Sequence, residues 1–100
     1  MPKQIKEKKQ RWGVIYRLTN LYTLMVYIGK SVEFKTRMGQ HRRMADGCRY
    51  LNNAIRKYGW DNFKKEIIID DVPEEDLSNL ETSYIDVEDT LAPNGYNLTK

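Results

Sequence analysis

Two tyrosine-containing tripeptides that lie one short hairpin apart constrain the fold of this chain more than any other feature. They are Val14-Ile15-Tyr16 and Tyr27-Ile28-Gly29. Each lies in a run of β-branched and aromatic residues typical of strands, over residues 13–19 and 24–30. If residues 20–23 form the centre of a symmetric hairpin, Tyr16 pairs with Tyr27, and both phenols lie on one face of a sheet. That loop has no glycine, so only symmetry sets the register.

The rest of the chain is predicted to form three helices and one more strand. Ser31 is placed to cap the first helix, with Glu33 in its first turn, and Gly59 is placed to end the second. The predicted elements are helices over residues 32–44 and 49–58, a strand over residues 63–70 that is buried against helices, and a helix opened by Pro73. This order predicts an α/β domain, β-β-α-α-β-α, with a small three-stranded, mainly antiparallel sheet flanked by three helices.

Two of the predicted helices carry ionisable residues within the stripe that should pack inward. The stripes are Phe34, Arg37, Met38 and His41 in the first helix, and Leu77, Leu80, Glu81 and Tyr84 in the third. A buried carboxylate such as Glu81 is normally paired, neutralised or bound to a metal, and Mg²⁺ would suit one carboxylate, waters and a substrate phosphate. The planar guanidinium of Arg37 suits bidentate contact with a phosphate.

Each of these residues also has a purely structural interpretation. Glu81 would pair with a lysine or arginine of the basic half, and Arg37 would form an internal ion pair with Glu81 or another acid. His41 would be a hydrogen-bonded core residue. Tyr16 and Tyr27 would be half-buried aromatic residues of the sheet. A phenol has a pKa of about 10, so a tyrosine that takes a proton from water needs a nearby cation or a metal-bound water. The residues taken singly leave both interpretations open.

The charges are distributed unevenly along the chain of 100 residues. Residues 1–65 hold sixteen Lys/Arg and four Asp/Glu, whereas residues 66–100 hold one Lys/Arg and ten Asp/Glu. A basic block of this size favours a polyanion such as nucleic acid, and a solvated surface explains it as well. Cys48 is the only cysteine, and neither a signal peptide nor a membrane-spanning run is visible. We therefore expect a cytoplasmic or otherwise intracellular protein that is neither secreted nor bound to a membrane.

The chain is predicted to contain one folded domain, residues 13–100, behind a basic lead, residues 1–12. Residues 1–11 hold five Lys/Arg and one Glu but almost no large apolar side chains. They cannot bury a core, and we expect them to be mobile. A chain of this length supports a single modest core.

The ordered set of residues resembles the GIY-YIG nucleases from about Gly13 to Asn97. The first tripeptide begins with Val14 where the family has glycine, and Arg49 stands where some homing-type members have a histidine. Lys30 matches a lysine that some branches use. The positions that carry the resemblance are the two tripeptides, Arg37, His41, Glu81, the aromatic Tyr84 and the closing run Asn94–Asn97.

The resemblance implies a metal-dependent endonuclease of homing or mobile-element type that hydrolyses DNA phosphodiester bonds. Glu81 is expected to hold one Mg²⁺ or Mn²⁺, and Arg37 to steady the scissile phosphate. Tyr16 is expected to activate or orient the water, while Tyr27 and His41 complete the hydrogen-bond network. The residues expected to bind the substrate are Lys30, Arg42, Arg43, Arg49 and Asn97.

Two other functions remain open from the sequence alone. One is a catalytically silent nucleic-acid-binding module of the same fold, and the other is an interaction domain whose basic and acidic portions pair in a partner or homodimer. As a nuclease, one active site must act twice or form a transient dimer on DNA to cut both strands. No DNA-recognition module follows Lys100, so we expect either an excised catalytic domain or a small free-standing nuclease.

Overall fold

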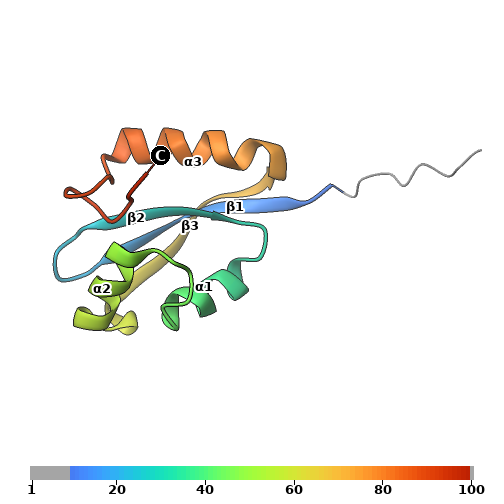
Figure 1. Ribbon diagram of the computed structural model, residues 1–100. Helices are drawn as coiled ribbons and strands as arrows, with labels where there is room; N and C mark the ends of the chain where they lie inside the picture. The colour runs from blue at the N-terminus through green and yellow to red at the C-terminus, as the bar shows by residue number, and fades with distance from the viewer. Residues whose placement is uncertain (1–9, 100) are drawn as a thin grey trace, which may run out of the picture.

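The computed structural model describes residues 10–99, and their elements follow the predicted order (Figure 1). The elements are β1 (Trp12–Asn20), β2 (Val26–Ser31), α1 (Phe34–Arg42), α2 (Arg49–Tyr58), a short 3₁₀ helix η1 (Trp60–Asn62), β3 (Phe63–Pro73) and α3 (Glu74–Glu88). The sheet has the strand order β2-β1-β3, and both strand pairs are antiparallel. The predicted α/β fold, with three strands and three helices, is confirmed.

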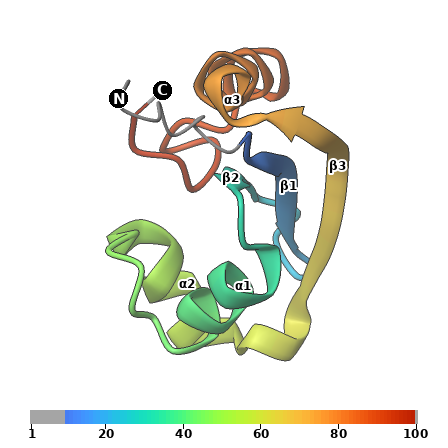
Figure 2. The same ribbon diagram turned by 90° about the vertical axis from the view of Figure 1, so that its right-hand side faces the viewer.

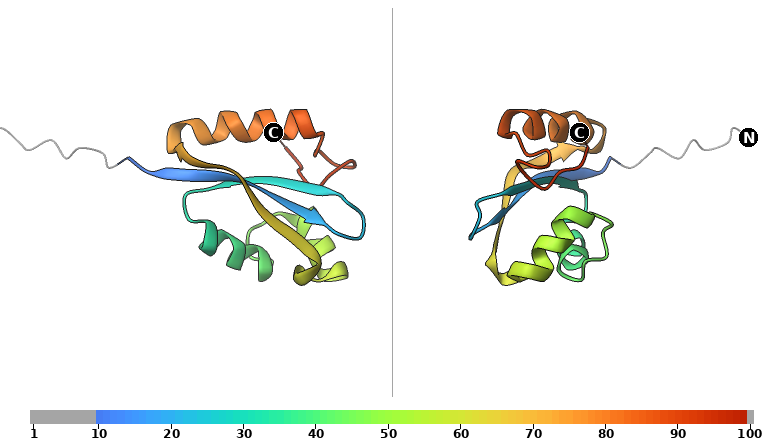
Figure 3. Two further views of the ribbon diagram at one scale, coloured as in Figure 1. Left: turned by 180° about the vertical axis from the view of Figure 1, so that it is seen from behind. Right: turned by 60° about the vertical axis from the view of Figure 1, so that its left-hand side comes forward.

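The sheet separates two layers of helix. Figures 1 and 2 show α3 on one face and α1 and α2 on the other, and Figure 3 shows the same layers from behind. Each face has its own core because successive side chains of a strand point to opposite sides. From the central strand β1, Tyr16 and Leu18 enter the core beneath α1 and α2, whereas Ile15 enters the core beneath α3. β1 therefore fixes Tyr16 at the centre of the layer that contains α1.

The hairpin between β1 and β2 has a different register from the predicted one. Tyr16 pairs with Gly29 rather than with Tyr27. The loop spans residues 21–25, and the side-chain oxygen of Asn20 organises it by accepting two loop amides at 2.9 and 3.3 Å. The shift is an even number of residues, so Tyr16 and Tyr27 still share a face, with ring centroids 6.3 Å apart.

Two other predicted details are wrong. Helix α1 begins at Phe34, because the hydroxyl of Ser31 accepts the amide of Glu33 at 2.9 Å in the turn before the helix and does not cap it. Strand β3 is an edge strand and is not buried against helices along its length, and the side chain of Ile67 is 44% exposed. The end of α2 is confirmed, since Gly59 terminates it with a φ of 88°.

The predicted basic lead, residues 1–12, falls mainly outside the described residues. Within the described part, Trp12 already belongs to β1, one residue before the predicted domain boundary. The carbonyl of Arg11 accepts the amide of Glu74 at 2.9 Å, which links the start of β1 to the start of α3. No helix within residues 10–99 has the length and apolar character needed to cross a membrane.

Gly29 provides the space in which the ring of Tyr16 lies against β2. A Cβ atom at Gly29 would lie 2.3 Å from both Cζ and Oη of Tyr16, far inside van der Waals contact. Both residues are buried, so the ring has no free space to move into. The second tripeptide therefore ends in glycine because a neighbouring ring occupies the place of a side chain.

We expect Gly29→Ala to displace the Tyr16 ring and to lower the free energy of unfolding by about 1–3 kcal/mol, the usual cost of overpacking a core. Gly39→Ala is the matched control. Its Cβ would meet only the flexible end of Arg43, and alanine favours a helix interior over glycine by about 0.5–1 kcal/mol. Denaturant unfolding of both variants measures the difference, and equal losses would contradict this account of Gly29.

Candidate active site

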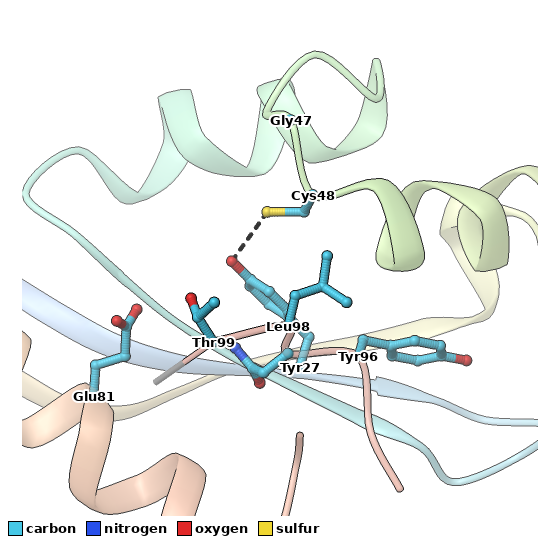
Figure 4. Close-up of a pocket in the computed structure, with 8 residues that line it drawn as sticks. Tyr27, Gly47, Cys48, Glu81, Tyr96, Leu98 and Thr99 are labelled. Atoms are coloured by element: carbon cyan, nitrogen blue, oxygen red, sulfur yellow. Dashed lines mark hydrogen bonds between the residues drawn. The ribbon is translucent and has the colours of Figure 1, made fainter. Parts of the chain in front are cut away.

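A cavity of about 380 Å³ opens beside the edge strand β2, where elements from both sides of the sheet meet. Figure 4 shows Glu81 on α3 at one side of this cavity, with Tyr27 of β2 and Cys48 at the other. The residues that line it are Tyr27, Gly47, Cys48, Glu81, Tyr96, Asn97, Leu98 and Thr99. Segments far apart in the sequence thus contribute to one recess.

Glu81 is a partly buried carboxylate that forms no salt bridge with any residue of the described chain. Burial raises the pKa of its carboxyl group, and the positive charges of Lys30 and Arg37 oppose that rise. These two cations act on Glu81 through space without pairing with it. The internal ion pair with Arg37, which would have made both residues structural, is not formed.

The surroundings of Glu81 fit a hard divalent cation. Mg²⁺ and Mn²⁺ accept carboxylate oxygen, water and phosphate oxygen as ligands, and Mg²⁺ usually keeps several waters. Glu81 offers one such carboxylate at an open cavity that has room for waters and a phosphate. Within residues 10–99, no group of three His, Cys, Asp or Glu side chains is arranged to hold a metal. An ion here would therefore be held by Glu81 together with waters and phosphate oxygens.

Two cations lie at a second cavity, of about 310 Å³, formed mainly by β2, α1 and α3. Lys30 donates a hydrogen bond from Nζ to the hydroxyl of Ser78 at 2.5 Å. Arg37 donates from Nη1 to the side-chain oxygen of Gln40 at 3.3 Å. Neither cation pairs with a carboxylate of the described residues. Cations that are held by neutral partners retain their charge for an anion such as phosphate.

Tyr16 and His41 form a hydrogen bond in the core beneath α1. The distance between Oη of Tyr16 and Nε2 of His41 is 2.7 Å, and neither residue has exposed surface. On the other side of the imidazole ring, Nδ1 contacts the carboxylate of Asp46. Burial raises the pKa of the Tyr16 hydroxyl and lowers the pKa of His41. Burial therefore favours the neutral form of both groups.

Of the two predicted catalytic tyrosines, Tyr27 is the one that lines the cavity. Its hydroxyl lies 3.2 Å from Sγ of Cys48, as the dashed line in Figure 4 shows. Burial, followed by the neighbouring Tyr16, raises the pKa of the Tyr27 hydroxyl. The two tyrosines are packed together as predicted, but Tyr16 is enclosed whereas Tyr27 contributes to the cavity wall.

Asn97 has a structural role that we did not predict. Its Oδ1 accepts the amide of Ile28 at 2.9 Å and the hydroxyl of Thr90 at 2.7 Å, and its Nδ2 donates to the carbonyl of Ile28 at 2.9 Å. These bonds attach the segment after α3 to β2. Asn97 also lines the cavity, and its expected contact with substrate stays a prediction.

The predicted arginines of the substrate surface lie outside the cavity. Arg42 and Arg43 are exposed at the end of α1, and Arg49 is exposed at the start of α2. Their contacts with DNA stay predictions. The sequence reasoning missed Asp46 and Cys48, which lie in the loop before α2, where no helical or strand periodicity relates them to the other site residues.

Comparison with known proteins places this geometry in a family. The sequence model described as the GIY-YIG catalytic domain matches residues 12–97. A curated relative from Enterobacteria phage T4, named "Putative endonuclease segD", is 30% identical over 84 residues. That match covers 84% of this chain and 36% of the phage protein, so the chain spans about a third of the relative's length.

Two solved structures share the fold. One is the catalytic domain of intron endonuclease I-TevI in a mutant form, with a TM-score of 0.74 and 22% identity, which covers 88% of this chain and 94% of that chain. The other is the catalytic domain of homing endonuclease I-TevI, with a TM-score of 0.72 and 20% identity. That match covers 88% of this chain and 99% of that chain. Since the family model spans the sheet, the helices and every candidate catalytic residue, this chain belongs to the GIY-YIG family of nuclease domains.

Proposed function

We propose that this protein is a metal-dependent endonuclease of homing or mobile-element type, which hydrolyses phosphodiester bonds in DNA. The observation that carries the proposal is Glu81, a carboxylate with no salt-bridge partner in the described chain, at a cavity that also contains Tyr27. The family match and the endonuclease names of the relatives support this choice of reaction. DNA is the expected substrate, and the basic residues 1–65 supply the attraction.

Glu81 would hold one Mg²⁺ or Mn²⁺ in this reaction. When bound, the ion would supply positive charge that stabilises the phosphate and the leaving oxygen. The carboxyl group must be ionised to bind a cation, and its pKa is raised by burial. Metal binding should therefore weaken as the pH falls, beginning at a higher pH than for an ordinary glutamate.

Arg37 and Lys30 would neutralise the phosphate that is being cut. The negative charge on the phosphate changes its distribution in the transition state, and preorganised donors lower the barrier without reorganisation. The Arg37 guanidinium can offer two parallel N–H groups to phosphate oxygens. Its present partner is the neutral side chain of Gln40 at 3.3 Å, which a phosphate can displace at small cost.

Tyr16 would accept a proton from the attacking water, and His41 would accept the proton that Tyr16 gives up. The raised pKa of Tyr16 prevents a stable phenolate, so its oxygen can accept a proton only while its own proton passes to Nε2 of His41. Tyr16 is enclosed in the free protein, and its contact with water would form when substrate is bound, as catalytic hydrogen bonds often do. Tyr27 would form part of the wall that positions the substrate.

The isolated domain is expected to bind DNA weakly and with little sequence preference. Its cationic groups suit phosphate contacts, and phosphate contacts carry no direct sequence information. A single site cuts one strand at a time. Cutting both strands would therefore require two successive events or a transient dimer on the DNA.

Removing the Glu81 carboxylate should abolish cutting. We expect Glu81→Ala and Glu81→Gln to lower the rate of plasmid nicking by about a hundredfold or more, the scale for losing one group that stabilises transition-state charge. The assay compares Mg²⁺, Mn²⁺ and EDTA. Asp76→Asn, an exposed carboxylate on the same helix, is the control and should cut at the wild-type rate.

Full activity of the Glu81 variants, or wild-type nicking in EDTA, would overturn the proposed metal site. Salt-sensitive DNA binding without nicking in either metal would instead indicate the catalytically silent module.

Replacing Arg37 should reduce catalysis more than binding. We expect Arg37→Ala to lower the cleavage rate of bound DNA by about 10²–10³-fold, and Arg37→Lys to restore only part of it, because lysine keeps the charge but loses the planar fork. Lys35→Ala, an exposed residue of the same helix, should change only the salt dependence of binding. Single-turnover cleavage and filter binding separate the two effects, and equal cleavage by Arg37→Ala and wild type would refute this role.

A further inference from the structure

Asp46 is a buried carboxylate with no role in the reaction proposed above. It lies in the loop between α1 and α2, and its side chain has no exposed surface. One carboxylate oxygen, Oδ1, accepts the amide of Cys48 at 3.0 Å. The other, Oδ2, contacts Nδ1 of His41. No lysine or arginine of the described residues forms a salt bridge with it.

The contact with Asp46 determines which nitrogen of His41 carries the proton. A carboxylate can only accept, so Nδ1 of the neutral ring must be the donor. Nε2 then has a free lone pair, and it accepts the hydroxyl of Tyr16 at 2.7 Å. The order Asp46, His41, Tyr16 is therefore a directed chain in which every donor points toward the carboxylate.

The two carboxylate oxygens of Asp46 have different roles: Oδ1 stabilises the loop, and Oδ2 contacts the imidazole ring of His41. The bond from Cys48 to Oδ1 closes a turn within the loop, which Asn also does. The contact between Oδ2 and His41 connects the loop to α1 and requires an acceptor. Burying a carboxylate is costly, and a turn alone does not require a charge.

We propose that Asp46 is a positioning residue of the nuclease reaction, which keeps Nδ1 of His41 protonated so that Nε2 can receive the hydroxyl proton of Tyr16. This inference rests on the proposed function. As water attacks phosphorus, one of its protons passes to Oη of Tyr16, and the original phenol proton passes to Nε2. The new P–O bond forms while the bond to the leaving oxygen breaks, and that oxygen takes a proton from solvent.

Asp46 would then stabilise the imidazolium formed in this step. The proton returns to solvent through Tyr16 when the products leave, which restores the neutral ring. Burial and Arg37 lower the pKa of His41, and Asp46 raises it. The titratable groups around the ring are Tyr16 on β1, Tyr27 on β2, Arg37 on α1 and Asp46 in the loop. Cys48 lies one step further away, against the hydroxyl of Tyr27.

Asp46→Asn tests this role because it keeps the turn and removes the charge. The amide oxygen can still accept the Cys48 N–H, while its NH₂ group then faces Nδ1. We expect the ring to change to the tautomer with its proton on Nε2, which cannot accept the Tyr16 hydroxyl. Loss of such an orienting partner typically lowers activity by about 10–100-fold.

The tautomer can be measured directly because the chain contains one histidine. Nitrogen-15 NMR of the full chain without a histidine tag reports which ring nitrogen is protonated, with no assignment ambiguity. We expect the proton on Nδ1 in the wild type and in the control Asp61→Asn, which alters an exposed aspartate of η1. An unchanged tautomer in Asp46→Asn would overturn the proposal.

The pH profile of nicking is the second readout. The profile is measured at saturating Mg²⁺, so that ionisation of Glu81 does not limit the rate. The rate then requires neutral His41, and its acid limb follows the pKa of the ring. Removing Asp46 removes an influence that raises this pKa, and the acid limb should move to lower pH while the plateau rate falls. A lower plateau rate with an unmoved acid limb would indicate a structural role only. Asp46→Ser removes the carboxylate and its charge, so a wild-type rate and pH profile in this variant would also contradict the proposal.

The two proposals fail in different ways. If the wild-type chain cuts no DNA in either metal, the proposed function fails, and the NMR measurement still decides whether Asp46 fixes the imidazole. If the wild type cuts and Asp46→Asn cuts equally well over the whole pH range, the nuclease assignment stands and the role of Asp46 is refuted. DNA affinity and thermal unfolding of each variant confirm that the compared proteins are folded.

Discussion

The buried hydrogen bond between Tyr16 and His41 is the interaction on which the rest of this structure depends. It joins the central strand to α1 across a core with no exposed surface. The bond requires Gly29 opposite Tyr16, since any side chain there would occupy the position of the phenol. A polar pair in such a place must have every partner satisfied, because unmet hydrogen bonds are costly in a low-dielectric interior. On the far side of the ring, the carboxylate of Asp46 contacts Nδ1.

The two sides of the sheet contribute different kinds of group to the site. The neutral pair of Tyr16 and His41 lies beneath α1, whereas Glu81 reaches the same edge of the sheet from α3. β2 is the strand at which both layers can contribute to one recess, because an edge strand leaves one side uncovered. The pair proposed to transfer protons and the carboxylate proposed to bind a cation would thus be close without forming an ion pair that disables both.

The sequence predicted the elements of this fold well because their periodicity is strong. Helix α2 has the predicted bounds, and the inward positions of Arg37, His41 and Glu81 followed from helical spacing alone. The hairpin register was wrong because a side chain, that of Asn20, organises the loop, and no glycine signalled its geometry. Asp46 was missed because it lies in a loop, and the path of that loop brings it to His41. Helical or strand periodicity does not predict such a path. Site residues on helices and strands could therefore be predicted from the sequence, whereas those in the loop before α2 could not.

The bonds made by Asn97 have a consequence for how this domain meets other chains. β2 is an edge strand, and exposed edges invite pairing with strands of other molecules. Asn97 gives Ile28 one acceptor and one donor, as the backbone of a neighbouring strand would, and the amide of Tyr96 occupies the carbonyl of Val26. The segment after α3 therefore occupies backbone groups of β2 that a strand from another molecule would otherwise bind. At Val26 and Ile28 the edge is thus closed to β-augmentation, although no described residue forms a fourth strand there.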